Sequence, residues 1–261
     1  MHQDDFRLGV IGAGGWLGRA IVECVLVGKA VPAERLYLST RTPREGVFTE
    51  ANWVRDNQDL VDRSDVVILS VRPMDFSALK INTAGKLVLS VMSSISIARM
   101  MADLGTDRIV RALPNAAAEV ARSYTPWVAS PACSDTDRAI ARAVFATCGS
   151  QDELPDERQI EYSAGVSGTG PAYLALLADA LRKHAIANGI APEIARNAVN
   201  AMLIGTGRLV EAQGRCPSDI VGDFLAYQGM TTAALESMMD AGLDRIVREG
   251  VEAALKRAQE L

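Results

Sequence analysis

The chain has 261 residues, of which 49% are hydrophobic and 23% charged, and these ordinary globular values exclude collagen-like, low-complexity and wholly disordered proteins. At roughly 150 residues per domain, the length accommodates one large or two modest domains with a substantial core. The 27 Lys and Arg against 32 Asp and Glu give a net charge of −5, and no basic cluster is long enough to follow a phosphate backbone, so no nucleic-acid partner is expected.

The first half of the chain alternates strand-like and helix-like segments. A short apolar run over 7–11 stops at Gly12, and residues 16–29 then place apolar side chains at helical spacing. A second strand over 35–38 ends in a polar loop, so these segments form a βαβ unit. Further strands, apolar enough to be covered on both faces, are predicted at 65–71, 87–91 and 108–112. The alternation predicts an α/β fold with a doubly wound parallel sheet.

From residue 156 onward, the spacing of apolar residues changes to the period of a helix. Prolines stand where first helical turns tolerate them and glycines stand where helices end, at Pro171, Pro192, Gly189 and Gly242. At least four helices are therefore predicted. We expect two domains, a doubly wound domain over 1–155 and an all-helical domain over 156–261.

One of the predicted helices carries small residues that permit close packing against another helix. Gly205 and Gly207 lie within it, among apolar residues at helical spacing. The facing helix belongs either to the same chain or to a second subunit, and the residues alone leave both alternatives open.

The cysteines and the N-terminus indicate the cellular setting. The four cysteines are far apart with no CxxC pair, and only two histidines could join them, so neither a metal site nor a disulfide framework is expected. Residues 1–5 lead directly into a strand-like segment rather than into a signal peptide, and no apolar run reaches about 18 residues. We expect a reducing, cytoplasmic setting and no membrane partner.

A glycine-rich turn lies between the first predicted strand and the first predicted helix. Glycines in this context let the backbone approach a pyrophosphate while the helix N-terminus faces the phosphates. Its place in a βαβ unit favours a dinucleotide site over the alternative, an ordinary tight turn. The residues expected to bind the cofactor here are Gly12, Gly14, Gly15, Trp16 and Leu17.

The end of the second predicted strand indicates which dinucleotide is preferred. NAD-preferring sites usually present Asp or Glu there, whereas this chain presents Ser39, Thr40 and Arg41. No carboxylate repels a 2′-phosphate, and Arg41, with Arg44, offers hydrogen-bond donors to one. We therefore expect NADPH in preference to NADH. The alternative is that Arg41 is a solvated loop charge.

Several motifs occur in order along nearly the whole chain. Besides the glycine turn they are Val71-Arg72-Pro73, Leu-Pro-Asn at 113–115, SGTGPAY at 167–173 and MTTAAL at 230–235. As an ordered set they resemble pyrroline-5-carboxylate reductases. The resemblance implies a Rossmann domain followed by a helical domain that dimerises through interlocking helices, with active sites built from both subunits. It also implies NADPH-dependent reduction of the cyclic imine pyrroline-5-carboxylate to proline, and leaves assembly beyond a dimer open.

The resemblance also implies site residues. Those added to the cofactor site are Ser39, Thr40, Arg41, Asn57, Val71, Arg72 and Pro73, with Ser93 and Ser94 beside the nicotinamide. On the substrate side, Thr232 would contact the ring nitrogen and Thr231, with nearby N–H groups, would hold the carboxylate. Asn115 and Pro114 would shape the wall beside the nicotinamide. For Thr232 the residues alone favour another interpretation, ordinary helix capping.

The substrate loop departs from the family pattern. Where the family reads Ser-Pro-Gly-Gly-Thr-Thr, this chain reads YQGMTT over 227–232. Glycine adopts positive φ readily whereas Met230 would be strained there, so we expect this loop to run differently. Tyr227 and Met230 also add apolar bulk that would suit a larger ring substituent. The glycine turn is one residue longer than is common in the family, and we expect the cofactor to tolerate this.

The expected chemistry makes few demands on acid or base catalysis. Hydride transfer requires the donor within about 3–3.5 Å of the electrophilic carbon and a protonated or hydrogen-bonded imine nitrogen. A protonated pyrroline already carries its proton, which agrees with matched residues that include neither His nor Lys. Two alternatives stay open: a paralogous reductase of another cyclic imine or imino acid, and a regulator that binds NADP without turnover.

Overall fold

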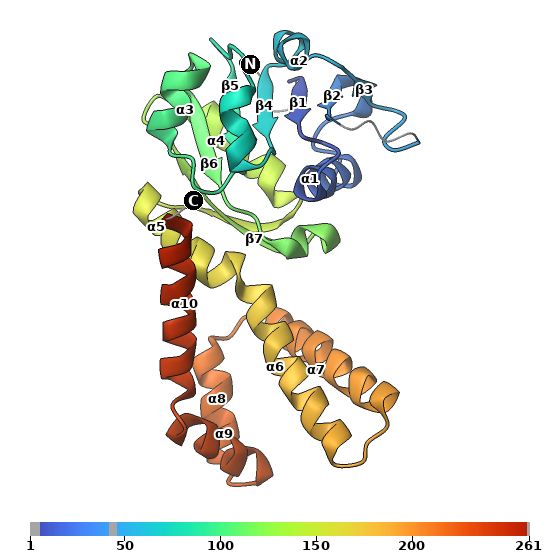
Figure 1. Cartoon of the computed structure of the whole chain (residues 1–261), viewed down its shortest axis with the longest axis vertical. Helices are drawn as coiled ribbons and strands as arrows, with labels where there is room; N and C mark the ends of the chain where they lie inside the picture. The colour runs from blue at the N-terminus through green and yellow to red at the C-terminus, as the bar shows by residue number, and fades with distance from the viewer. Residues whose placement is uncertain (1–5, 42–45, 260–261) are drawn as a thin grey trace. The chain divides into compact units, whose positions relative to one another are not determined.

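The computed structural model describes residues 6–41 and 46–259, and its contacts divide the chain into two compact units (Figure 1). The first comprises Met1–Thr169 with Leu255–Leu261, and the second comprises Gly170–Ala254. This division falls later than residue 156 because the first helix after that position packs on the sheet of the first unit. As a domain boundary, 155/156 stays a prediction.

The first unit is built on an eight-stranded sheet in the order β3-β2-β1-β4-β5-β6-β7-β8. Strands β3 to β6 in this order are parallel, β7 is antiparallel to β6, and β8 is parallel to β7. Their bounds are β1 Leu8–Ile11, β2 Leu36–Ser39, β3 Asn52–Trp53, β4 Val66–Leu69, β5 Leu87–Ser90, β6 Ile109–Ala112, β7 Ser123–Ala129 and β8 Gly149–Glu153. The chain runs outward from β1 in both directions, which confirms the predicted doubly wound sheet and puts the switch point between β1 and β4.

Helices cover the sheet, and side chains at their starts fix several of them. Asp56 accepts the Asp59 N–H at the start of α2, Ser96 accepts the Arg99 N–H at the start of α3, and Ser134 forms a capping box with Asp137 in α4. The α-helices of this unit are α1 Trp16–Val27, α2 Asn57–Arg63, α3 Ile97–Leu104, α4 Asp135–Ala146 and α5 Glu157–Ser163. Short 3-10 segments and one π-helical segment accompany them, namely η1 Ala33–Arg35, η2 Pro73–Ala78, η3 Ala116–Val120 and the π-helical η4 Ala164–Gly168.

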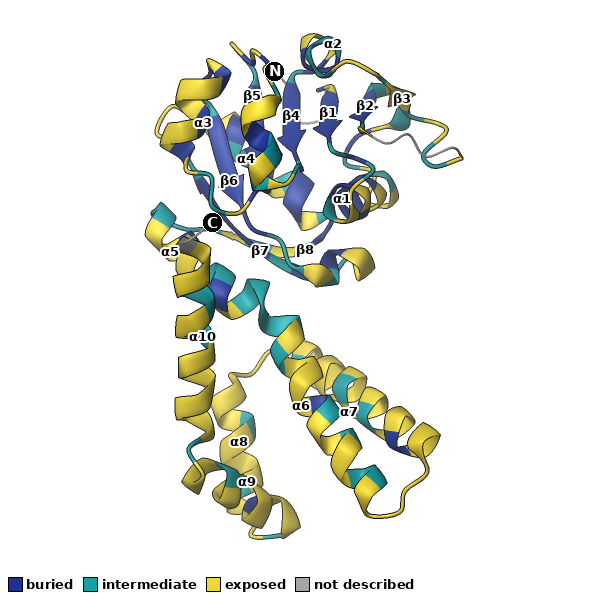
Figure 2. Ribbon diagram, viewed as in Figure 1, coloured by how far each residue is buried: buried dark blue, intermediate teal, exposed yellow. Residues whose placement is uncertain are grey.

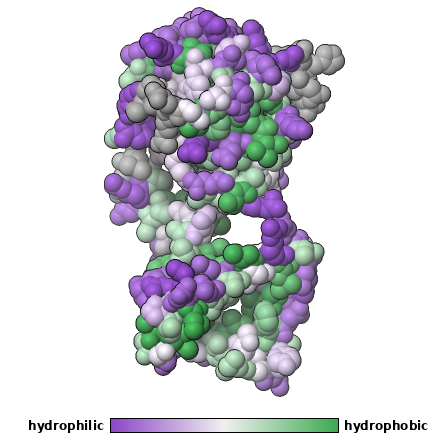
Figure 3. Space-filling view, turned by 90° about the vertical axis from the view of Figure 1, so that its right-hand side faces the viewer, coloured by the Kyte–Doolittle hydropathy of each residue, from purple (hydrophilic) through white to green (hydrophobic). Residues whose placement is uncertain are grey.

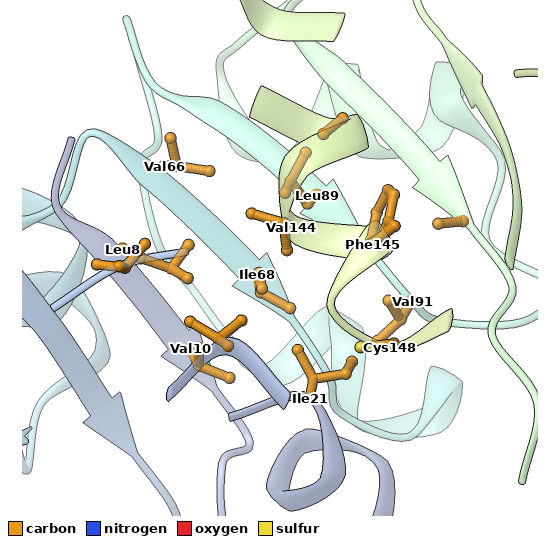
Figure 4. Packing of buried hydrophobic residues seen from close by; sticks show 14 of the residues in the cluster. Leu8, Val10, Ile21, Val66, Ile68, Leu89, Val91, Val144, Phe145 and Cys148 are labelled. Carbon is orange, nitrogen blue, oxygen red and sulfur yellow. The ribbon is translucent and has the colours of Figure 1, made fainter. Parts of the chain in front are cut away.

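The sheet separates two hydrophobic clusters because successive strand residues face opposite sides. Val66 and Ile68 of β4 belong to the cluster that includes α1 and α4, part of which is shown in Figure 4. Val67 and Leu69 belong to the cluster that includes α2, α3 and Ile160 of α5. Strands β1, β4, β5 and β6 are therefore buried on both faces, and Figure 2 shows β1 and β4 in dark blue.

The second unit is helical and exposes much of its apolar surface. Its helices are α6 Gly170–Ala187, α7 Pro192–Gln213, α8 Pro217–Ala226, α9 Met230–Asp240 and α10 Leu243–Gln259, of which α10 ends in the first unit. Among the described side chains of this unit only Ala178, Ala195 and Thr232 are buried. Figure 3 shows hydrophobic side chains gathered on its surface in the lower half of the view. The predicted helical second half is confirmed.

No helix in the described part of the chain is both long and apolar enough to cross a membrane. No group of three or more His, Cys, Asp or Glu side chains comes together there as a metal site.

Candidate functional site

The glycine turn is wedged between the carboxyl ends of β1, β2 and β4. Gly12 has a φ of 92°, and a Cβ built on it would lie 2.2 Å from the Ser70 carbonyl oxygen, so only glycine fits. The N–H groups of Gly12 and Ala13 both donate to the Ser39 carbonyl at 3.0 Å. A Cβ on Gly14 would lie 2.4 Å from Thr40 Oγ1. The turn therefore brings its backbone close to the end of β2.

The start of α1 supplies the groups that an anion requires. Gly15 is the N-cap without a side chain, so the N–H groups of the first turn have no acceptor within the helix. A Cβ on Gly18 would lie 2.3 Å from the Gly12 carbonyl oxygen, so Gly18 lets helix and strand pack closely despite the extra residue in the turn. A cavity of about 440 Å³ adjoins this turn and is lined by Gly14, Gly15, Trp16, Arg19, Ala20, Glu23 and Glu119.

Trp16, half exposed at the first position of α1, is tethered across this cavity. Its indole N–H donates to the Glu119 carboxylate in η3. Nothing in the sequence indicated this pair, because the two residues are 103 positions apart. The Leu17 side chain packs against the first hydrophobic cluster. Its backbone N–H lies in the first turn of α1, where N–H groups have no acceptor within the helix.

The residues expected at the adenosine ribose meet at the ends of β2 and β4. The buried Ser39 hydroxyl donates to Asn57 Oδ1 at 2.8 Å. Arg41 is 77% exposed, with Nη1 at 3.5 Å from the Asp75 carboxylate, and Arg72 Nε donates to the same carboxylate at 2.9 Å. The Arg72 hydrogen bond lowers the pKa of Asp75, which therefore stays ionised. Arg44 lies outside the described residues.

The remaining residues predicted to bind the cofactor follow β4 and β5. Val71 lies beside Gly12, since its Cγ1 would be 3.3 Å from a Cβ built there, and Pro73 opens η2. Ser94 has a φ of 61° and its hydroxyl donates to the Ala258 carbonyl at 3.2 Å. Ser93 and Ser94 share a cavity of about 510 Å³ whose other lining residues are Arg111, Leu113, Arg158, Glu161, Tyr162, Ala164, Leu255 and Ala258.

Asn115, the N-cap of η3, ties two turns of the first unit together. Its Oδ1 accepts the Ala117 N–H at 3.0 Å, and its Nδ2 donates to the Ser167 carbonyl at 2.9 Å. Ser167 lies in the π-helical η4, and such turns are frequent at functional sites. The Asn115 amide therefore holds the backbone around Pro114. The place of Asn115 and Pro114 in a wall beside the nicotinamide stays a prediction.

The loop before α9 carries its left-handed residue earlier than Met230. Gln228 has a φ of 52°, Gly229 is the N-cap, and Met230 is the first residue of the helix. Met230 is therefore not strained, because Gln228 adopts the conformation that glycine favours. The side chains of Tyr227 and Met230 are 82% and 91% exposed.

The two threonines at the start of α9 differ in their bonding. The Thr232 hydroxyl, on a residue only 8% exposed, accepts the Gly229 N–H at 3.1 Å and donates to the Phe224 carbonyl at 2.9 Å. Thr232 thus caps the helix, the interpretation that the residues alone favoured, while its catalytic role stays a prediction. Thr231 is exposed, and no hydrogen bond to its hydroxyl is found within the described residues. The first-turn N–H groups beside it have no helical acceptor.

Comparisons of the sequence and of the fold with known proteins find the same kind of enzyme. A family model described as pyrroline-5-carboxylate reductase dimerisation matches residues 157–261. The chain is 30% identical to the pyrroline-5-carboxylate reductase of Synechocystis sp. and 31% identical to that of Thermus thermophilus, covering 98% of this chain and 98% of each relative. The solved structure of Plasmodium falciparum pyrroline carboxylate reductase with NADP bound shares the fold, with a TM-score of 0.84 at 22% identity over 98% of both chains.

Proposed function

The chain belongs to the pyrroline-5-carboxylate reductase family, and from this we propose that it reduces the C=N bond of pyrroline-5-carboxylate to give proline. The observation that carries the proposal is the match over 98% of the chain to curated reductases that bear this name. The named relatives act on a cyclic imine, and the motifs that support the assignment span both units of this chain.

The first unit fits a dinucleotide cofactor. The cradle at Gly12 has no room for a Cβ, and the first-turn N–H groups of α1 are free to donate to a pyrophosphate. NADPH, when bound, supplies the hydride. Ser39 and Asn57 would hold the adenosine ribose, while the loops after β4 and β5 would flank the other half of the dinucleotide.

NADPH is proposed in preference to NADH because the end of β2, where the adenosine ribose would lie, carries Arg41 and no carboxylate. Arg41 and Arg72 both converge on Asp75 in this structure. Arg41 is the more exposed of the two and holds Asp75 by one longer contact, so it is the one free to turn toward a 2′-phosphate. Ser39 and Thr40 add hydroxyl groups at the same strand end.

At the start of α9, the free N–H groups and the Thr231 hydroxyl are proposed to hold the substrate carboxylate. The Thr232 hydroxyl gives its proton to Phe224 and accepts the Gly229 N–H, which leaves one lone pair on the oxygen. Thr232 can therefore accept a hydrogen bond from a protonated ring nitrogen but does not protonate it. The iminium would bring its own proton, and orientation would supply much of the rate.

The partner of the helical unit is proposed to be a second copy of the chain. Residues 157–261 match a dimerisation family, and the described side chains of this unit leave large apolar residues exposed. Each active site would then combine the sheet of one protomer with the α9 of its partner.

The test is to follow NADPH oxidation by the purified protein with pyrroline-5-carboxylate and to identify proline as the product. We expect turnover with NADPH, slower turnover with NADH, and loss of that difference in Arg41→Ala. Arg63→Ala is the matched control, since Arg63 is also exposed and ion-paired to an aspartate, but on α2. Tight NADPH binding without oxidation in the presence of any cyclic imine would instead identify a regulator.

A second candidate, reduction of a bulkier cyclic imine, is favoured by the loop before α9. Tyr227 and Met230 stand almost fully exposed on either side of Gly229, where the family pattern has serine and glycine. Assaying cyclic imines with apolar ring substituents beside pyrroline-5-carboxylate separates the two substrates. Higher kcat/KM for the substituted imines, reversed in Met230→Gly, would support this candidate.

A further inference from the structure

A buried arginine, Arg111, lines the cavity of Ser93 and Ser94. Arg111, in β6, is paired in register with Ser90, the last residue of β5, and its side chain is 1% exposed. Its Nη1 donates to Glu157 Oε1 at 2.8 Å and to Glu161 Oε1 at 3.2 Å. Both carboxylates come from α5, and we refer to these three residues as the Arg111 cluster.

In the Arg111 cluster, the arginine bridges two carboxylates instead of forming one strong two-donor ion pair. Arginine pairs most strongly with a carboxylate through two parallel N–H donors. Here one nitrogen, Nη1, serves both carboxylates, while Nε is buried without a hydrogen-bond partner among the described residues. A well-packed apolar side chain would stabilise this position as well as such an arrangement does. We therefore explain the arrangement by the elements that the Arg111 cluster connects, β6 and α5, rather than by the strength of its ion pairs.

Glu157 extends the cluster to the loop that carries the two serines. The same Oε1 that accepts from Arg111 also accepts the N–H of Ile97, the first residue of α3, at 3.0 Å. Residues 91–96 connect β5 to that helix, and Ser94 within them is held in a left-handed conformation uncommon for serine. Glu161, by contrast, accepts from Arg111, and within the described part of the chain no hydrogen bond from α3 to Glu161 is found.

This loop lies where the second half of a dinucleotide would be placed. In doubly wound sheets the ligand crosses the carboxyl ends of the strands at the switch point, here between β1 and β4. The glycine turn after β1 accounts for the pyrophosphate and the end of β2 for the adenosine ribose. The loops after β4 and β5 are left for the nicotinamide half, and the cavity of about 510 Å³ opens beside the second of them.

We propose that Arg111 and Glu157 are positioning residues for the nicotinamide half of the cofactor, acting through the start of α3 on the loop of Ser93 and Ser94. The proposal rests on the proposed function for the identity of the cofactor. Neither residue needs to touch the reacting atoms. Their effect is to fix the backbone of 91–96 between β5 and α3 at one distance from the sheet.

The test compares Glu157→Ala with the matched control Glu161→Ala, which removes the other α5 carboxylate from the same arginine. The dissociation constants of NADP⁺ and of adenosine 2′,5′-bisphosphate, which lacks the nicotinamide half, are measured by titration calorimetry. Loss of one charge-assisted anchor is expected to weaken NADP⁺ by about tenfold in Glu157→Ala and by about twofold in Glu161→Ala, with the bisphosphate unchanged in both. Glu157→Gln keeps an oxygen acceptor and is expected to restore most of the NADP⁺ affinity.

Equal weakening in the two alanine variants, or weakening of the bisphosphate in parallel with NADP⁺, would show that the cluster only supports the fold. Unchanged NADP⁺ affinity in Glu157→Ala would overturn the proposal as well. The proposed function fails separately, through absent imine turnover in a wild-type protein that binds NADP⁺. Wild-type protein that binds no dinucleotide would overturn both.

Discussion

At the scale of single residues, Gly12 and Gly85 share a backbone conformation but not an environment. Both have positive φ, 92° and 75°. A Cβ on Gly12 would collide with the Ser70 carbonyl, whereas nothing lies within 4 Å of a Cβ on Gly85. The two positions therefore separate the conformational strain of an alanine from the loss of space in the turn that is proposed to bind the cofactor.

We predict that Gly12→Ala weakens NADPH binding by more than about tenfold, because the turn must shift away from β4 and with it the N–H groups that face the pyrophosphate. Gly85→Ala, the control, is expected to cost about 1 kcal/mol of stability through strain and to leave NADPH affinity unchanged. Fluorescence titration with NADPH and urea unfolding measure the two effects. Equal NADPH affinities in both variants would contradict the assignment of this turn.

The sequence separation between contacting residues decided which residues of the candidate site could be predicted. The glycine turn is contiguous, so its pattern was visible in the sequence. The bond from Asn115 to Ser167 spans 52 positions and that from Arg111 to Glu157 spans 46, and neither has a local signature. Arg111 stood next to the Leu-Pro-Asn motif without any sign that two carboxylates would converge on it.

At the scale of elements, the central strands were predictable and the edges of the sheet were not. Apolar runs in the sequence predict the central, buried strands, which are β1, β2, β4, β5 and β6. At one edge β3 has two residues, and at the other β8 reads GSQDE, which is polar because an edge strand is partly solvated. β7 contains Pro126, which argues against an interior strand from sequence alone.

Helix α4 was likewise not predicted, and its start depends on a buried carboxylate. Asp137 is 1% exposed, completes the capping box with Ser134, and accepts hydrogen bonds from Arg108, one of them from Nε at 3.1 Å. Burial alone would raise the pKa of Asp137, but the hydrogen bonds from Arg108 and Ser134 outweigh burial and lower it. The ionised carboxylate is thus more favoured in the folded chain than in the unfolded chain.

A depressed pKa in the folded state adds stability above the unfolded value, about 3.9 for Asp, and this stability is lost as pH falls through the folded value. We therefore predict that Asp137→Asn lowers the free energy of unfolding by about 2 kcal/mol at neutral pH, with a difference that shrinks below about pH 4. Urea unfolding across this range measures it. Asp103→Asn, which breaks an exposed pair with Arg99, is expected to change stability by less than about 0.5 kcal/mol. A pH-independent difference for Asp137→Asn would show that the charge is not what stabilises α4.

At the scale of the whole molecule, the two units bury apolar side chains to different degrees. The sheet unit buries long runs of Val, Ile and Leu, whereas in the helical unit Leu176 and Ile204 are 72% and 67% exposed. Where one helix packs mainly against a single neighbour, as α6 does against α7, an apolar face of each is left uncovered. Because water penalises such a surface, the helical unit is expected to be stable only when a second copy covers it.

We predict that Leu176→Arg and Ile204→Arg each convert the proposed dimer to monomer. A charge in the centre of an apolar interface costs about 2 kcal/mol or more, roughly a thirtyfold loss of affinity. Val27→Arg is the control, because Val27 is equally exposed at 78% but lies on α1 of the sheet unit. Sedimentation velocity measures association and NADPH oxidation measures activity. If active sites combine two protomers, the monomeric variants lose turnover while retaining affinity for NADPH, because the glycine turn and the end of β2 are complete within one chain. A monomeric variant with full turnover would contradict shared sites even though the dimer itself had been disrupted.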